Sequence, residues 1–273
     1  MTHGSRQRLV RAVRRPDADL AEAALLVCAE AEPDLDVDVT LLRLDALADG
    51  LRTRGFRSAT PVEDARSLAA YLAGEQGFTG DDATYHDPDN ALLTRVLDRK
   101  QGLPITLSIL YVAIARRLDV PAYAINLPGH VVTAIPSDDR PVVFDPFHGG
   151  RLLEEAEIAA RIERASGGRL GFRRAMLRPS PAVNVVRRLL NNLTRDYTTA
   201  ERLRDALWTV ELKLLLPNRM PDDHRVHGEL LARLGRFDAA ADAFETYLEV
   251  AGPDAPDLEE VRRSAIGARA RMN

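Results

Sequence analysis

His130 and Asp145 are the two residues of this chain whose types and spacing most directly predict chemistry. They stand at mirrored positions around a short polar stretch in the segment NLPGHVVTAIPSDDRPVVFDPFHGG, residues 126–150. An imidazole that is held by a carboxylate can act as a general acid or base, as in the orienting half of a nucleophile, histidine and carboxylate triad. The segment therefore predicts such a pair and raises the question of which nucleophile it serves.

The pair depends on a β-hairpin. The runs HVVTAI and PVVFD are short, rich in valine and separated by turn residues, which is typical of two antiparallel strands. With residues 136–139 in the loop, Ile135 pairs with Arg140, and His130 then lies directly across from Asp145. Opposed residues share a face with Cβ atoms about 4.5–5.5 Å apart, so the two side chains can hydrogen-bond. A register slip of one residue would put them on opposite faces, so the prediction rests on the turn.

The strongest helical segment, PITLSILYVAIARRLDVP, precedes this hairpin. Pro104 suits its first position, Pro121 follows its end, and its apolar residues lie nearly all round the helix, which predicts a buried helix. The start of such a helix is where a cysteine nucleophile is best activated, because the helix dipole and free N–H groups stabilise a thiolate. The residue at this position is proline, which has no nucleophilic atom.

The segment RKQGLPITLSILYVAIARRLDVPAYAINLPGHVVTAI, followed by VVFDPFHGGRLL, resembles the SirB1 family of transglutaminase-like proteins. The segments AALLVCAEAEPDLDV, YHDPDNALLTRVLDRKQG and RLLNNLTRDY extend the similarity over most of the chain. In active enzymes of this kind, Cys stands at a helix start, His at the beginning of a strand and Asp near the end of the next. His130 and Asp145 match the last two positions, and Pro104 stands where the cysteine belongs.

The resemblance implies a bacterial protein with an α+β fold and three parts. A basic tail, residues 1–17, contains the arginine-rich run SRQRLVRAVRRP and is predicted to be frayed and solvated. Residues 18–178 form a transglutaminase-like, papain-like domain with a helical N-terminal part and a small antiparallel sheet. Residues 179–273 form a helical region similar to tetratricopeptide repeats. The sequence itself supports this region, because Ala206, Val210 and Leu214 recur 34 residues later as Ala240, Phe244 and Leu248, and 34 is the tetratricopeptide period.

Two other residues are candidate nucleophiles. Cys28, the single cysteine, lies on the apolar stripe of a predicted helix 76 residues before Pro104, so we interpret it as a small core residue. Thr106, two residues after Pro104, has a hydroxyl near the helix start, although a threonine at such a position more often bonds backbone than attacks a substrate. We therefore expect no thiol acyl transfer and keep Thr106 as a tentative catalytic residue.

Four residues are predicted to line a binding cleft beside the pair: Pro104, Asn126, His148 and Asn90. The default roles of the two asparagines are capping and turn formation, and Asn90 is predicted to be the N-cap of the helix that follows it. Gly149 and Gly150 place His148 on a turn. A metal site built from His130, Asp145, His148 and His86 is an alternative, but the core that the chain resembles binds no catalytic metal, so we expect neither metal nor cofactor.

Composition excludes several classes of function. The net charge of −4 and the 5% aromatic content argue against a nucleic-acid-binding protein. One cysteine excludes an intrachain disulfide, and no apolar run reaches the roughly 18 residues of a membrane span, so we expect a cytoplasmic protein without membrane partners.

Three hypotheses of function follow. The first is a regulatory or accessory protein that lacks the catalytic cysteine, binds a peptide, protein or small molecule in the cleft, and can bind a protein partner on its helical repeats. The second is an enzyme that uses His130, oriented by Asp145, as general acid and base on a peptide, amide or related carbonyl substrate, with water or Thr106 as the attacking group. The third is a scaffold that acts through its repeats alone.

Overall fold

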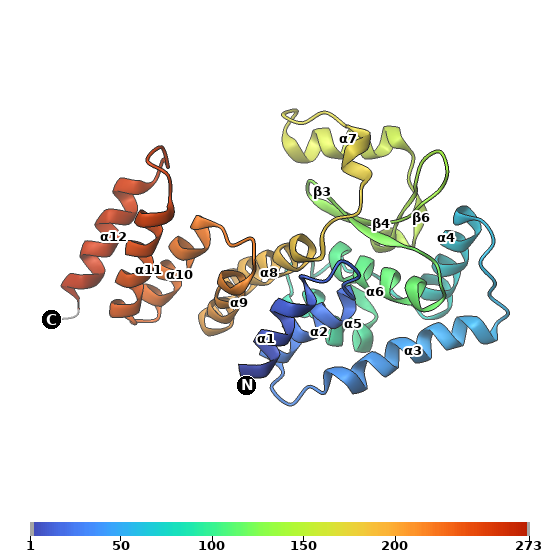
Figure 1. The fold of residues 1–273 in the computed structure, drawn as a ribbon, viewed down its shortest axis with the longest axis horizontal. Helices are drawn as coiled ribbons and strands as arrows, with labels where there is room; N and C mark the ends of the chain where they lie inside the picture. Colours follow the sequence, from blue (N-terminus) through green and yellow to red (C-terminus); the bar gives the residue numbers. More distant parts are fainter. Residues whose placement is uncertain (1–2, 272–273) are drawn as a thin grey trace. The chain divides into compact units, whose positions relative to one another are not determined.

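The computed structural model of the protein describes residues 3–271 and divides them into two compact units. The division falls after Leu189, inside helix α8 (Ala182–Thr199), whereas the sequence prediction placed the start of the C-terminal region at residue 179. Helices predominate and the strands form small sheets, which confirms the α+β fold (Figure 1).

The N-terminal unit holds most of the elements. Its α-helices before α8 are α1 His3–Ala12, α2 Leu20–Ala31, α3 Val37–Thr53, α4 Pro61–Ala69, α5 Leu93–Arg99, α6 Pro104–Arg117 and α7 Glu155–Ser166. Shorter helical turns are η1 Ala70–Glu75, η2 Pro88–Ala91, η3 Pro146–His148 and η4 Arg174–Leu177. The strands are β1 Thr79–Gly80, β2 Gln101–Gly102, β3 Tyr123–Leu127, β4 His130–Ile135, β5 Val142–Asp145 and β6 Arg151–Leu152.

The predicted solvated tail is instead helix α1 for its residues 3–12, and its first two residues lie outside the described part. Leu9 is buried, and Arg6 donates two hydrogen bonds of 2.9 Å to the Glu30 carboxylate. Arg8 donates to Glu22 at 2.8 Å. The arginines thus pair with carboxylates of α2, and the buried apolar face gives the segment a reason to fold that the charge pattern alone did not reveal.

Helix α6 forms the centre of the N-terminal unit. It begins at Pro104, and every residue from there to Ala115 is buried. Proline is tolerated at a first helical position because the N–H that it lacks has no partner within the helix. The predicted buried helix is confirmed, and its start is fixed in the interior beside β2 and η2.

A four-stranded antiparallel sheet in the order β3-β4-β5-β6 lies between α6 and α7 (Figure 1). Ile125, Val132 and Val143 on one face share a hydrophobic cluster with Ile158 and Ile162 of α7. On the other face, Ser108 of α6 donates a hydrogen bond to the Val131 carbonyl. Side chains alternate between faces along each strand, so each residue's position in the sequence decides which helix it meets.

The C-terminal unit is helical, with α9 Leu203–Leu215, α10 Pro221–Arg233, α11 Phe237–Val250 and α12 Leu258–Ala270. Helices α9 and α11 begin 34 residues apart, and the repeated positions Ala206, Val210, Ala240 and Phe244 are buried. Gly228 of α10 lies so close to the Phe244 ring that an added Cβ would be 2.6 Å from it. The predicted repeat therefore corresponds to packed helical hairpins.

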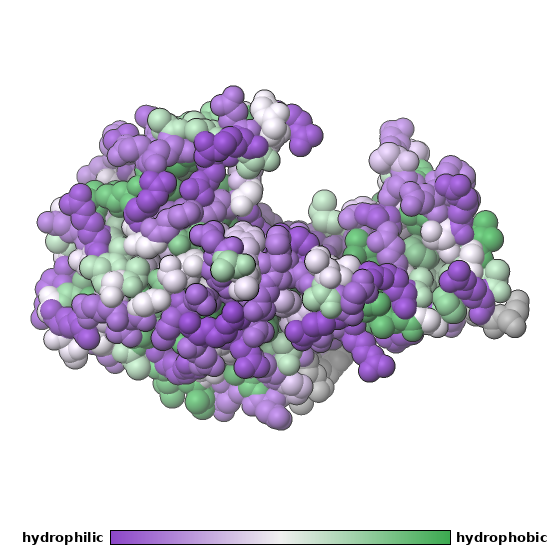
Figure 2. All heavy atoms as spheres, turned by 180° about the vertical axis from the view of Figure 1, so that it is seen from behind, coloured by the Kyte–Doolittle hydropathy of each residue, from purple (hydrophilic) through white to green (hydrophobic). Residues whose placement is uncertain are grey.

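Among residues 3–271, no helix combines the length and the apolar character needed to cross a membrane. On the face drawn in Figure 2, hydrophilic residues predominate and hydrophobic residues are scattered among them.

Candidate functional site

The register of the β4–β5 hairpin differs from the prediction. Ile135 pairs with Val142 and Thr133 with Phe144, so the loop spans residues 136–141, and the predicted pairing of Ile135 with Arg140 is wrong by two residues. Continuing the observed register places Asp145 opposite Val132 rather than opposite His130. A shift of two residues preserves the face, because side chains alternate with a period of two. His130 and Asp145 are therefore diagonal neighbours on the α7 face of the sheet.

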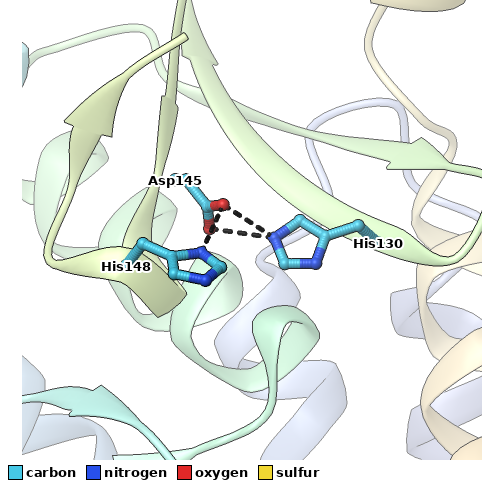
Figure 3. A group of neighbouring side chains, drawn as sticks. All are labelled: His130, Asp145 and His148. Carbon is cyan, nitrogen blue, oxygen red and sulfur yellow. Dashed lines mark hydrogen bonds and ion pairs between the residues drawn. The ribbon is translucent and has the colours of Figure 1, made fainter. Parts of the chain in front are cut away.

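Diagonal neighbours on a sheet are still close enough for long side chains to meet. His130 donates through Nε2 to Asp145, with the nitrogen 2.9 Å from Oδ1 and 3.0 Å from Oδ2 (Figure 3). Asp145 is completely buried and His130 is 7% exposed. The second ring nitrogen of His130 points away from the carboxylate (Figure 3), which leaves it for a ligand or for water.

Three further donors converge on the same carboxylate. His148 donates from Nδ1 to Oδ2 at 2.8 Å, and the backbone N–H of Phe147 donates to Oδ1 at 3.2 Å. The guanidinium of Arg161, on α7, lies 3.3 Å from Oδ2. The His148 side chain is 44% exposed, so the site reaches solvent through this second imidazole. Arg161 was not predicted, because no local pattern in α7 distinguishes it from a solvated arginine.

The pKa of Asp145 reflects two opposed effects. Burial raises it, since a charged carboxylate loses its hydration, but the hydrogen bonds and charges of His130 and His148 outweigh burial and hold it below the ordinary value. Asp145 is therefore ionised at neutral pH. An ionised acceptor fixes the tautomers and orientations of both imidazoles.

The start of α6 supplies no free nucleophile. Thr106 is completely buried, and its hydroxyl donates to the Asn90 carbonyl at 2.6 Å and lies 3.1 Å from the Leu103 carbonyl. The thiol of Cys28 is buried in α2, and burial raises its pKa to about 11. The interpretation of Cys28 as a core residue is confirmed.

Asn90 has a structural position that differs from the prediction. It lies inside η2, and the residue before α5 is Leu92, so Asn90 is not the N-cap of that helix. It is completely buried and donates through Nδ2 to Asp81 at 3.0 Å and to the Thr84 carbonyl at 2.8 Å. These bonds tie the 81–91 segment together next to Thr106.

Asn126 is also separated from the pair. It is opposite Val131 in the β3–β4 ladder, whereas Leu127 is opposite His130. Alternation therefore places the Asn126 side chain on the face away from His130. Its backbone N–H donates to the Ser180 hydroxyl at 2.8 Å.

Phe147 lies close both to the two imidazoles and to the short strand β1. Its ring centroid lies 6.1 Å from that of His130 and 5.1 Å from that of His148. On another side it covers Gly80, where an added Cβ would be 2.6 Å from the ring. Gly80 pairs with Gly102, two residues before Pro104. The Phe147 ring thus lies beside both imidazoles and against β1, whose partner strand β2 leads into α6.

His130, Asp145 and His148 could also hold a metal ion, since one ligand atom from each lies within 4.8 Å of the others. Two imidazoles and one carboxylate are ligands of several divalent transition metals. Against this, Arg161 already neutralises the carboxylate, and both imidazoles donate to it. A second cation beside Arg161 would be repelled, so the donor set fits a hydrogen-bonded network better than a metal centre.

Comparison with known proteins identifies the same two regions. Residues 39–191 match the family model described as the transglutaminase-like superfamily, and residues 193–265 match that of the tetratricopeptide repeat. A UPF0162 protein of Xylella fastidiosa (strain 9a5c) is 31% identical over 247 residues, 89% of this chain and 87% of that protein. A UPF0162 protein of Pseudomonas aeruginosa is 32% identical over 197 residues, 71% of this chain and 72% of its own length. The crystal structure of menin aligns with a TM-score of 0.42 and 13% identity over 95% of this chain and 73% of menin, which does not establish a shared fold.

Proposed function

This chain belongs to the transglutaminase-like superfamily and to the UPF0162 proteins, and we propose that, within this family, it is a binding protein without thiol catalysis. Its N-terminal unit binds a peptide or small ligand beside His130 and His148. Its tetratricopeptide-like helices offer a separate surface to a protein partner, as such repeats generally do. The proposal includes a SirB1-like regulatory or accessory role in the cytoplasm.

One observation carries the proposal: the start of α6 has no group that can attack a carbonyl carbon. Pro104 stands at the first helical position, and the nearby hydroxyl of Thr106 is buried and bonded to backbone carbonyls. Covalent acyl transfer needs an activated nucleophile within hydrogen-bond reach of its base. The imidazole–carboxylate group remains, and without a nucleophile it is a set of oriented donors for a ligand.

A specific observation favours general acid–base catalysis as the second candidate. Two imidazoles share one ionised carboxylate, and His148 is partly exposed. With water as the attacking group, His130 or His148 could transfer a proton on an amide or ester substrate, and Asp145 would hold the imidazole in the required orientation.

The two candidates are separated by assaying the full-length protein for turnover and binding in parallel. Turnover is measured with pooled peptide, amide and ester substrates, and binding with a peptide library, using ¹⁵N-histidine NMR to observe His130 and His148. We expect ligand-induced shifts of these two signals and no turnover. His130→Ala is expected to lose binding at least tenfold.

His224→Ala, which removes an imidazole from the C-terminal unit, is the control and should leave the affinity unchanged. Turnover that disappears in a folded His130→Ala variant but persists in His224→Ala would overturn the binding proposal and establish the enzyme.

A further inference from the structure

A segment that begins inside α7, after the three glutamates Glu154, Glu155 and Glu157 that follow the sheet, has a charge opposite to that of the chain as a whole. Residues 158–190 contain one glutamate and eight arginines, a formal charge of +7, whereas the whole chain carries −4. The arginines are Arg161, Arg164, Arg169, Arg173, Arg174, Arg178, Arg187 and Arg188. A concentration of positive charge of this kind attracts anions.

Two of these arginines, on different helices, bond either to the imidazole–carboxylate group or to the strand residue opposite His130. Arg161 of α7 pairs with Asp145, the partner of His130. Arg188 of α8 donates through Nη1 to the Leu127 carbonyl at 2.5 Å, and Leu127 is opposite His130 in the β3–β4 ladder. Arg161 is therefore connected to His130 through Asp145. Arg188 is connected to it through Leu127, the residue opposite His130 in the neighbouring strand.

The charge of Arg188 has no counterion among residues 3–271. Arg161 is paired with Asp145, but the hydrogen bond of Arg188 goes to a neutral carbonyl, and the structure gives it no carboxylate partner. The residue is half-buried, and burial lowers the pKa of its guanidinium. A partly desolvated charge without a partner is costly, and an anionic ligand would remove that cost.

Two aromatic rings connect the surroundings of Arg188 to His148. Tyr85 lies in the electrostatic field of Arg188, and its ring packs against Phe147. His148 is partly exposed beside the same ring. The carboxylate beside His148, Asp145, is completely buried and already accepts from His130, His148 and the Phe147 N–H. Asp145 is thus already occupied by its own partners, whereas Arg188 has no carboxylate partner among residues 3–271.

We propose that the N-terminal unit binds an oxyanion, the carboxylate or phosphate of its ligand, with Arg188 as the principal contact and His148 as a second donor. The planar fork of an arginine fits two oxygens of either group, which a point charge does not. The inference rests on the proposed function and specifies the ligand class for the same site.

The test uses full-length protein labelled with ¹⁵N-histidine, at neutral pH in a buffer free of phosphate and carboxylate. Inorganic phosphate and succinate are the oxyanion probes, acetamide is the neutral probe, and zinc chloride alone is the cation probe. We expect saturable shifts of His130 and His148 with one or both oxyanions and none with acetamide. The stronger of the two oxyanions identifies the source of the charge, carboxylate or phosphate.

Arg188→Gln is expected to weaken oxyanion binding at least tenfold. Arg188→Lys keeps the positive charge but loses the planar, two-pronged guanidinium, so it should weaken oxyanion binding about threefold or more. This variant also tests the inference if Arg188→Gln does not fold. Arg173→Gln removes an exposed arginine from the same basic segment and should change the affinity less than twofold. Circular dichroism and the Tm establish that each variant is folded.

Three outcomes would overturn the inference: no shift with either oxyanion, equal weakening in Arg188→Gln and Arg173→Gln, or saturable zinc binding at His130 and His148 without oxyanion binding. A neutral or cationic peptide that binds the wild type would refute the oxyanion while leaving the proposed binding function intact. Turnover together with Arg188-dependent oxyanion binding would refute the proposed non-catalytic function and leave the oxyanion inference intact.

Discussion

At the scale of single residues, the candidate site depends on one buried carboxylate. Asp145 is completely enclosed and is held by two imidazoles, a guanidinium and a backbone N–H. A buried charge persists only where its partners replace its hydration, and removing one member of such a group leaves the others uncompensated. Asp145 is thus a positioning residue for His130, His148 and Arg161.

Asp145 also predicts how stability depends on pH. Its pKa is lowered in the folded protein, so its contribution is fully present above the unfolded value of about 3.8 and is lost as pH falls through the lower folded value. Asp145→Asn should reduce the free energy of unfolding at pH 7 by about 3 kcal/mol, because Arg161 loses its counterion. The difference from wild type should shrink as the pH falls below 3.8.

Urea unfolding between pH 2.5 and pH 7 measures this difference. Asp82→Asn, at an exposed position, is the control and should change stability by less than about 0.5 kcal/mol at any pH. A difference between Asp145→Asn and wild type that stays constant down to pH 2.5 would refute the role assigned to the ionised carboxylate.

At the scale of elements, close packing between η3 and the short β1–β2 pair holds the site against α6. The Phe147 ring lies where a side chain at Gly80 would be. Gly80 is paired with Gly102, two residues before the start of α6. His130 and His148 contact the same ring. The glycine is required here for space, since the Phe147 ring occupies the position that a side chain would need.

Gly80→Ala is therefore expected to push Phe147 away, to destabilise the protein by about 1–3 kcal/mol, and to shift the NMR signals of His130 and His148. Gly74→Ala is a matched control, because no atom lies within 4 Å of the added Cβ, and it should be neutral or slightly stabilising. Urea unfolding and ¹⁵N-histidine spectra measure both effects; unchanged histidine signals in Gly80→Ala would show that Phe147 does not position the imidazoles.

At the scale of the whole molecule, two compact units with different architectures share one chain. The N-terminal unit surrounds a central helix and a small sheet, whereas the helical hairpins of the C-terminal unit pack mainly on their neighbours in sequence. Whole-chain composition conceals this organisation. The net charge of −4 gives no sign of the segment with +7 that borders the candidate site.

The division into two units predicts that the destabilisations caused by one substitution in each unit will add. Gly228→Ala places a Cβ 2.6 Å from the Phe244 ring in the C-terminal unit, and Gly80→Ala does the same at Phe147 in the N-terminal unit. The two substitutions share no contacting residue, so their destabilisations should add within about 0.5 kcal/mol. A double-mutant cycle by urea unfolding measures this, and a larger coupling energy would show that the packing of one unit depends on the other.

The predictions that succeeded depend on local periodicity. The buried helix from Pro104, the 34-residue repeat and the shared face of His130 and Asp145 follow from periods of 3.6 and 2 and from repeat length, which near neighbours in the chain encode. The predicted register failed because a proline-rich loop gives no sharp signal for its length, and the helix of residues 3–12 was missed because its arginines obscured a buried face.

By itself, the sequence determined that an imidazole and a carboxylate share one face of a hairpin, and that a proline begins the buried helix before that hairpin. Only the tertiary structure decided which other groups join them. Arg161 on α7 pairs with Asp145, and Arg188, 61 residues after Leu127, bonds to the carbonyl of Leu127, because their helices pack against the sheet. Such contacts join residues distant in the chain, and no local pattern of residues specifies them.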